Sequence, residues 1–169
     1  MQKSYNSRVM GSKFEGTDKV DQTLKIIPAT LWDLSDVRKL ETASFEKDAW
    51  PLIEMIGVLT FPGVERWKAV LDNQMIGFVA VDIRKSQNLA WIATIAVSPS
   101  HRRLGLGTQL MQKAEEVAQV ERMRLSVRAG NWAALALYQK RGYVQIDVWP
   151  KYYTGKEDAV VMEKSLSTG

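Results

Sequence analysis

Residues 89–110 constrain the fold more than any other part of this chain of 169 residues. The stretch begins with LAWIATIAV, a nearly continuous apolar run that is typical of a strand buried on both faces in the middle of a sheet. A turn containing Pro99 and a basic loop with two glycines follow, and from Thr108 apolar residues recur at helical spacing. The stretch therefore predicts a central strand, a loop and a helix in succession.

The loop between this strand and helix has the composition of a phosphate-binding segment. Backbone N–H groups at the start of a helix lack intrahelical partners, and the helix dipole adds partial positive charge there. Gly105 and Gly107 allow close approach of an anion to the backbone, and Arg102 and Arg103 add charge. No GxxxxGK[ST] motif is present, and Leu110 stands where a dinucleotide-binding loop has its third small residue. Neither of these two classes of nucleotide-binding loop fits.

Composition excludes several other functions. The chain has no cysteine and one histidine, so disulfides and thiolate metal sites are impossible and no metal cofactor is expected. No apolar run approaches the roughly 18 residues of a membrane span, and no signal peptide is evident, which makes the cytoplasm the expected compartment. The net charge is +4 without a concentrated basic run, which argues against a nucleic-acid partner. Oligomeric state is left open.

The remaining sequence alternates strand-like and helix-like segments. Residues 1–22 lack any hydrophobic period and predict a mobile leader, followed by one domain over residues 23–169. Expected helices begin after a cap at Thr30 or Asp33, near Pro51, at Thr108 and after an N-cap at Asn131. Expected strands span residues 24–27, 65–71, 75–83, 89–97, 123–128, 143–149 and 159–166.

Three segments together resemble the GCN5-related N-acetyltransferase (GNAT) family. RRLGLG, residues 102–107, fits the family's pyrophosphate loop (Q/R)xxGx(G/A), and NWAALALYQKRGY, residues 131–143, resembles its later helix NxxAxxLYxxxGF. TGKEDAVVM, residues 154–162, resembles the branch that acetylates protein α-amino groups, notably bacterial ribosomal-protein alanine N-acetyltransferases. The resemblance implies a single GNAT-like α/β domain with a mixed, mostly antiparallel sheet of about seven strands flanked by about four helices.

The implied activity is direct transfer of acetyl from acetyl-CoA to an amine, foremost a protein N-terminal α-amine. Two alternatives remain open, namely a small-molecule amine acceptor and a CoA-binding sensor with impaired catalysis. The resemblance implies that the loop backbone holds the pyrophosphate and that the central strand pairs with the pantetheine arm. The implied cofactor-binding residues are Ile95, Ala96, Val97, Arg102, Arg103, Leu104, Gly105, Leu106, Gly107, Thr108, Asn131 and Tyr138.

The resemblance also assigns two catalytic groups. It implies that the Tyr138 phenol protonates the departing thiolate and that the Val97 N–H stabilises the oxyanion. Asn131 has an alternative role as a plain helix cap, and Tyr138 has one as a packing residue.

The general base is where the sequence departs from the family. Ser126 replaces the Glu of the ribosomal-protein enzymes, and Trp91 occupies the position of a Tyr used by other N-terminal acetyltransferases. An α-amine with a pKa near 8 costs only about 1.4 kcal/mol to neutralise at pH 7, so water is one candidate proton acceptor. Glu46 or Asp48, in the loop after the first helix, is the other.

Aromatic side chains in two loops are candidates for binding the acceptor. In relatives these loops flank the acceptor site, and here they carry Phe45, Trp50, Tyr152 and Tyr153. Such side chains can grip the first residues of a peptide, and the alternative is packing at the edge of the core. The remaining tryptophans, Trp32, Trp67, Trp132 and Trp149, are assigned to packing.

Overall fold

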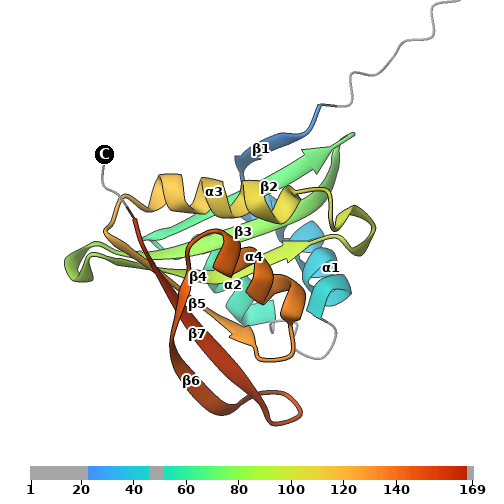
Figure 1. Ribbon diagram of the computed structural model, residues 1–169. Helices are drawn as coiled ribbons and strands as arrows, with labels where there is room; N and C mark the ends of the chain where they lie inside the picture. The colour runs from blue at the N-terminus through green and yellow to red at the C-terminus, as the bar shows by residue number, and fades with distance from the viewer. Residues whose placement is uncertain (1–22, 46–51, 167–169) are drawn as a thin grey trace, which may run out of the picture.

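Seven strands form one sheet in the computed structural model, which describes residues 23–45 and 52–166 (Figure 1). The order across the sheet is β1-β2-β3-β4-β5-β7-β6. All neighbouring strands are antiparallel except β4 and β5, which confirms the predicted mixed sheet. The strands are β1 (Lys25–Pro28), β2 (Val64–Leu71), β3 (Gln74–Arg84), β4 (Leu89–Val97), β5 (Arg122–Arg128), β6 (Val144–Tyr153) and β7 (Glu157–Ser165). The predicted leader, residues 1–22, lies outside the described residues.

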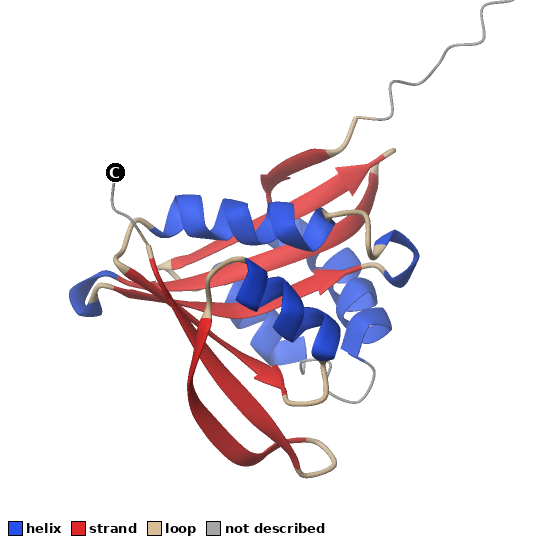
Figure 2. Ribbon diagram, in the orientation of Figure 1, coloured by secondary structure: helices blue, strands red, loops and turns tan. Residues whose placement is uncertain are grey.

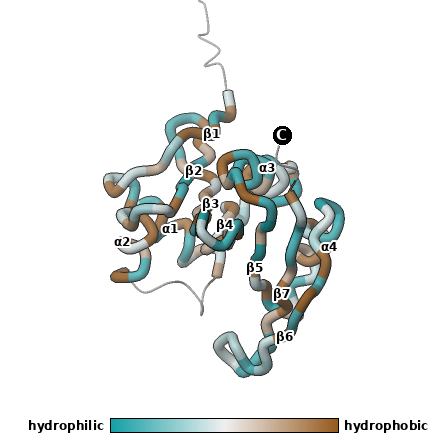
Figure 3. The backbone as a smooth tube through the Cα atoms, turned by 90° about the vertical axis from the view of Figure 1, so that its left-hand side faces the viewer, coloured by the Kyte–Doolittle hydropathy of each residue, from teal (hydrophilic) through white to brown (hydrophobic). Residues whose placement is uncertain are grey.

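Four α-helices cover the two faces of the sheet (Figure 2). They are α1 (Leu34–Phe45), α2 (Leu52–Thr60), α3 (Leu106–Ala118) and α4 (Trp132–Lys140), with single 3₁₀ turns η1 (Leu31–Asp33), η3 (Lys85–Gln87) and η4 (Pro99–His101). Seen edge-on, the sheet separates α1 and α2 from α3 and α4 (Figure 3). Within residues 23–45 and 52–166, none of the helices combines the length and apolar character needed to cross a membrane.

The central strand–loop–helix unit forms as predicted, with a correction at the helix start. β4 is the fourth of the seven strands, and none of its residues is exposed. The helix α3 begins at Leu106, two residues before the predicted start at Thr108. Gly105 occupies the N-cap in the left-handed conformation, with φ of 79°, and the Leu106 side chain is buried. Gly105 is therefore the last residue of the loop, and the buried Leu106 is the first residue of the helix.

The last hairpin differs from the prediction in the length of its first strand. β6 continues to Tyr153 rather than ending at Trp149, and residues 154–156 make the turn. An irregularity in the β6–β7 register between Trp149 and Tyr153 accommodates Pro150, which has no N–H to donate. Asp158 Oδ1 accepts a hydrogen bond of 2.8 Å from Lys151 N–H and so holds the irregular segment to β7.

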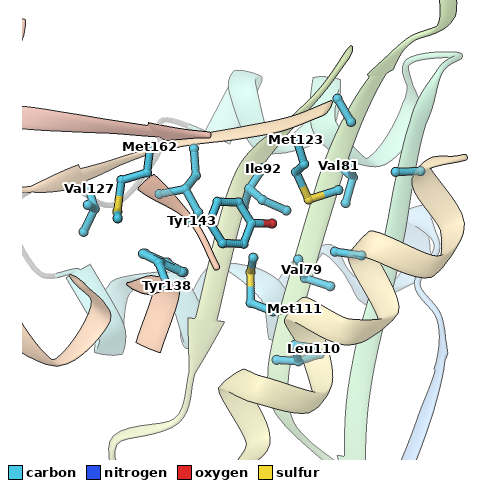
Figure 4. Packing of buried hydrophobic residues seen from close by; sticks show 14 of the residues in the cluster. Val79, Val81, Ile92, Leu110, Met111, Met123, Val127, Tyr138, Tyr143 and Met162 are labelled. Atoms are coloured by element: carbon cyan, nitrogen blue, oxygen red, sulfur yellow. The ribbon is translucent and has the colours of Figure 1, made fainter. Parts of the chain in front are cut away.

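The larger core lies between the sheet and the helices α3 and α4. Figure 4 shows the ring of Tyr143 among the side chains of this core, with Met111 and Met123 nearby. A smaller core lies beneath α1 and α2 and includes Val37, Leu40 and Phe78. The two cores make β3 and β4 the most enclosed strands of the sheet.

Two of the four tryptophans assigned to packing lie at the surface instead. Trp32 is 93% exposed and Trp132 is 77% exposed, so for these two the assignment is wrong. Trp32 lies in η1, which has no buried residue, and Trp132 is the first residue of α4, in which Tyr138 is the buried residue. Trp67 does pack against the larger core, and Trp149 stacks on Trp91 with ring centroids 5.9 Å apart.

Candidate active site

The parallel strands β4 and β5 pair only near their N-terminal ends, so the rest of one edge of β4 is unpaired. They pair only between Leu89–Trp91 and the three residues from Arg122 to Arg124. A bulge at Ala93 shifts the register of β4 against β3 just beyond this point. A cavity of about 530 Å³ opens along the unpaired end of β4. Bulges of this kind commonly redirect a strand beside a functional site.

Three regions of the chain line this cavity. They are the end of α1, the end of β4 with the loop into α3, and α4 with its N-cap. The lining residues are Ser44, Phe45, Ile95, Ala96, Val97, His101, Arg102, Arg103, Gly105, Leu106, Gly107, Thr108, Asn131, Ala133, Ala134, Leu137 and Tyr138. All predicted cofactor-binding residues except Leu104 are therefore brought together, and the Leu104 side chain is 70% exposed.

A second hollow lies on the outer side of α1 and includes none of the predicted site residues. Its volume is about 710 Å³, larger than that of the cavity beside β4. It is lined by Leu34, Ser35, Arg38, Lys39, Thr42, Ala43 and Leu52. Because none of its lining residues belongs to a strand or to the glycine loop, size alone does not make it the active site.

The loop into α3 forms an open cradle for an anion. A Cβ built at Gly105 would meet no atom within 4 Å, so the space beside the loop is free. The first backbone N–H groups of α3 follow directly, where helices bind phosphate. Arg102 tethers the loop, since its guanidinium donates to the carbonyls of Val97 and Ser44 at 3.4 Å each. These features fit a ligand that carries phosphate groups.

The backbone of Val97 faces the gap between β4 and β5. Ser98 N–H donates to the Ile76 carbonyl of β3 at 2.9 Å. Successive residues of a strand direct their N–H groups to opposite edges, so the Val97 N–H points away from β3. The Val97 carbonyl likewise accepts from Ser44 Oγ at 3.4 Å rather than from β3. An N–H donor at this position can therefore serve a bound ligand.

Tyr138 lies buried at the inner end of the cavity. Its side chain is 6% exposed and packs edge-on against Tyr143, with ring centroids 6.0 Å apart (Figure 4). Burial raises the pKa of the Tyr138 phenol well above its usual value, and the nearby Tyr153 raises it further. The hydroxyl therefore keeps its proton at neutral pH and can act as an acid.

Asn131 serves as the N-cap of α4, as predicted. Its Oδ1 accepts a hydrogen bond of 3.2 Å from Ala134 N–H. The side chain also lines the cavity, so its amide nitrogen can still reach a ligand. The two roles considered for this residue are therefore compatible.

A partly buried carboxylate network supports the ring of Tyr143, which packs against Tyr138. Glu115 of α3 accepts hydrogen bonds from Arg141 Nη2 at 2.7 Å, Lys164 Nζ at 2.8 Å and the Tyr143 hydroxyl at 3.3 Å. Burial alone would raise the pKa of Glu115, but the bonds to Arg141 and Lys164 outweigh it and lower the pKa. The network thus joins α3, the end of α4 and β7 around Tyr143.

Glu115→Gln is expected to lower the free energy of unfolding by about 3 kcal/mol at pH 7, because it leaves two partly buried cations without a counter-charge. The lowered pKa means that this stabilisation is complete above the unfolded-state pKa and is lost as the pH falls through the folded-state value. Urea unfolding at pH 7 and pH 3 should show a much smaller difference at pH 3. The control is Glu116→Gln, an exposed neighbour expected to change stability by less than about 0.5 kcal/mol. An equal loss at both pH values would contradict the electrostatic explanation.

Aromatic residues continue from β4 onto the β6–β7 hairpin. Trp149 stacks on Trp91. Its ring centroid lies 5.1 Å from that of Tyr152, and the ring centroids of Tyr152 and Tyr153 are also 5.1 Å apart. The Tyr153 hydroxyl donates to Ser126 Oγ at 3.4 Å. Neither Tyr152 nor Tyr153 lines the cavity, although the Tyr153–Ser126 contact places the hairpin against β5. Ser126, which stands where the ribosomal-protein enzymes have Glu, is therefore hydrogen-bonded to Tyr153, a residue predicted to bind the acceptor substrate.

The predicted residues of the loop after α1 are only partly placed. Phe45 lines the cavity, whereas Glu46, Asp48 and Trp50 lie outside the described residues. Sequence reasoning missed Glu41, which is 1% exposed and accepts a hydrogen bond of 2.5 Å from Thr94 Oγ1. Helical spacing could have indicated its burial. Glu41 stands four residues after Val37 and four before Phe45, which places it on the buried face of α1.

The cavity combines an unpaired strand edge, a glycine-capped helix N-terminus and a buried phenol, an arrangement suited to a phosphorylated ligand in an α/β domain. The family model described as Acetyltransferase (GNAT) family matches residues 32–143, more than half of the chain, and the protein therefore belongs to this family. Among the described residues, no group of His, Asp and Glu side chains is arranged to hold a metal ion.

Individual relatives support the same assignment. The catalytic subunit NAA10 of the N-terminal acetyltransferase A complex from Arabidopsis thaliana is 35% identical over 116 residues, which span 64% of this chain and 60% of that protein. The N-alpha-acetyltransferase of Sulfurisphaera tokodaii is 28% identical over 162 residues, covering 88% of this chain and 96% of its relative.

A solved structure confirms the fold. The ribosomal-protein-S18-alanine N-acetyltransferase from Escherichia coli superposes with a TM-score of 0.80 at 24% identity. The superposition covers 87% of this chain and 96% of that protein. The predicted GNAT-like domain is therefore confirmed.

Proposed function

We propose that this protein transfers acetyl from acetyl-CoA to the α-amine of a protein N-terminus. The observation that carries the proposal is the single cavity that unites the α3 N-terminus, the open edge of β4 and Tyr138. Membership of the acetyltransferase family gives the reaction class. The relatives described above are N-terminal or N-alpha-acetyltransferases, which favours a protein α-amine as acceptor. The cytoplasm is the compartment in which we expect such an enzyme to act.

Two parts of acetyl-CoA, the pyrophosphate and the pantetheine arm, match different groups in the cavity. The backbone N–H groups of residues 103–108 and the charges of Arg102 and Arg103 suit the pyrophosphate. The unpaired edge of β4 from Ile95 to Val97 suits the amide groups of the pantetheine arm, which would add to the sheet like a strand. The bound cosubstrate supplies the activated acetyl thioester. The chain's own backbone and side chains are assigned to hold the cosubstrate, to stabilise the oxyanion and to protonate the leaving thiolate.

Two groups are assigned to the acetyl-transfer step. The Val97 N–H donates to the oxyanion that develops on the acetyl carbonyl. The Tyr138 hydroxyl, which is protonated at neutral pH, gives its proton to the departing thiolate. For the acceptor amine, water, Glu46 or Asp48 remains a predicted proton acceptor, since the Ser126 hydroxyl is too weak a base and Trp91 has no basic atom.

The acceptor is expected to reach the sheet from the side of α1 and the β6–β7 hairpin. Phe45 borders the cavity, and Tyr153 contacts β5 at Ser126. With Trp50 and Tyr152, these aromatic side chains would enclose the first residues of a peptide.

The deciding experiment follows thiol release from acetyl-CoA with peptides and small amines as acceptors. We expect turnover of peptides with a free N-terminus and none with the same peptides blocked at the N-terminus. Lysine side chains should be poor acceptors, because neutralising an amine with a pKa near 10.4 costs about 4.6 kcal/mol at pH 7. Faster turnover of small amines would overturn the assigned acceptor, and CoA binding without turnover of any acceptor would indicate a sensor.

A further inference from the structure

Glu41 is a buried carboxylate that the assigned reaction groups leave without a role. Its side chain is 1% exposed, and Oε1 accepts the hydrogen bond from Thr94 Oγ1. Its other oxygen, Oε2, has no hydrogen-bond partner among the described residues. Burying a carboxylate with an unsatisfied oxygen costs stability, and such groups occur preferentially at functional sites. A purely structural helix would gain stability from an apolar side chain at this position.

Glu41 is tied on both sides to segments that form the cavity. Ser44 and Phe45 follow one helical turn later on α1 and line the cavity. Thr94 directly precedes Ile95, the first residue of the β4 edge that lines it. Since Ser44 Oγ also donates to the Val97 carbonyl, the end of α1 is held against the end of β4 at the assigned oxyanion donor.

The face of the sheet that Glu41 adjoins is the one from which the acceptor is expected. Met123, Leu125 and Val127 of β5 belong to the larger core under α3 and α4, so Arg124 and Ser126 project from the opposite face. The guanidinium of Arg124 lies 5.9 Å from the ring of Trp91, which places Trp91 on that face as well. The Trp91 indole N–H is buried and has no hydrogen-bond partner among the described residues. Two unsatisfied polar atoms, Glu41 Oε2 and Trp91 Nε1, therefore lie on the face of the sheet from which the acceptor is expected.

Within the described residues, no cation neutralises Glu41. The elements packed most closely against α1 are η1, α2, β3 and β4, and β4 has no titratable side chain. Arg102, in the loop into α3, reaches α1 at the Ser44 carbonyl and has no hydrogen bond or ion pair to Glu41. Asp33 pairs with Lys68, Asp82 pairs with Arg84, and Glu54 is exposed on α2. On α1 itself, Asp36, Arg38 and Lys39 are exposed. Burial raises the pKa of Glu41, and the hydrogen bond from Thr94 opposes it only in part.

We propose that Glu41 accepts a proton from the acceptor ammonium through one bridging water, an assignment that rests on the proposed function. Loss of this proton leaves a neutral amine, whose nitrogen forms the C–N bond to the acetyl carbon while the C–S bond breaks. Tyr138 protonates the thiolate and recovers a proton from the newly formed amide nitrogen through solvent. Glu41 returns its proton to solvent, so one proton is released per turnover.

Glu41→Gln tests the proposal because it keeps the shape and the oxygen that accepts from Thr94 but cannot take up a proton. We expect kcat/KM for an α-amine peptide to fall about tenfold at pH 6.5 to 7 and the difference to close near pH 8.5, where the amine is itself neutral. Acetyl-CoA affinity measured by calorimetry should not change.

A second readout is independent of activity. A raised folded-state pKa means that the neutral carboxyl stabilises the fold fully below its unfolded-state pKa and loses this effect as the pH rises through the folded-state value. Glutamine mimics the neutral form at every pH. The unfolding temperature of the variant should therefore equal or exceed that of the wild type at pH 8.

Thr94→Val and Glu46→Gln are the matched comparisons. Thr94→Val removes the hydrogen bond and keeps the carboxylate. The variant should therefore keep the wild-type dependence of kcat/KM on pH at the acidic side of the profile, called here the acidic limb. The proposal is overturned if Glu41→Gln keeps the wild-type profile, if Glu46→Gln removes the acidic limb instead, or if Glu41→Gln lowers stability, cofactor affinity and activity equally at every pH. Absence of wild-type turnover with any peptide would refute the proposed function itself, which is a separate outcome.

Discussion

Tyr138→Phe is expected to lower kcat about 10²-fold or more while leaving acetyl-CoA affinity nearly unchanged. The variant keeps the ring that packs edge-on against Tyr143 and lines the cavity, so binding surfaces are preserved. It removes only the hydroxyl, which is the proton donor in the assigned reaction. Steady-state and single-turnover kinetics on one peptide, with calorimetry for acetyl-CoA, would measure both quantities.

Tyr143→Phe is the matched control for this substitution. Its hydroxyl bonds Glu115 rather than lining the cavity, so its loss should cost about 1 kcal/mol of stability and little turnover. Nearly wild-type turnover by Tyr138→Phe, with chemistry shown to be rate-limiting, would return Tyr138 to a packing role.

Replacing Gly105 and Gly107 together with valine is expected to abolish measurable acetyl-CoA binding. Gly105 has φ of 79°, which valine adopts only with strain of about 1–3 kcal/mol, so the loop should rearrange and turn its N–H groups away. A Cβ at Gly107 would lie 3.2 Å from Leu137 Cδ2 and push against α4. Calorimetry of acetyl-CoA binding, on protein shown by circular dichroism to be folded, measures the effect.

Gly155→Val provides the control for backbone strain alone. Gly155 has φ of 84° and open space around it, which matches Gly105, but it lies in the turn between β6 and β7. Its substitution should lower stability similarly and leave acetyl-CoA affinity intact. If the loop variant binds acetyl-CoA as the wild type does, the pyrophosphate site has been assigned to the wrong segment.

Much of the cofactor side of the site was predictable because its information is local. A buried strand, a left-handed glycine and a helix start occupy neighbouring residues, so LAWIATIAV and RRLGLG specify the cradle without distant contacts. The N-cap role of Asn131 is local in the same way, since Oδ1 bonds an N–H three residues later. The two-residue error at the start of α3 arose where Gly105, rather than a polar cap, began the helix.

The acceptor side depends on residues far apart in the sequence. Glu41 meets Thr94 across 53 positions, and Tyr153 meets Ser126 across 27. Neither pair leaves a periodic signal, because each contact follows from how α1 and the β6–β7 hairpin pack onto the sheet. The exposed Trp32 and Trp132 show the same dependence, since an aromatic residue is buried only where another element covers it.

Hydrophobic period, turn chemistry and the two glycines therefore specify the strands, the helices and the anion cradle, because backbone geometry imposes those patterns on neighbouring residues. The separation of β4 from β5, the insertion of β7 between β5 and β6, and the burial of Glu41 against Thr94 came only from tertiary packing. These features arise when segments distant in sequence compete to cover the same sheet, and the packing that results, rather than any local pattern, determines which polar groups are enclosed beside the cavity.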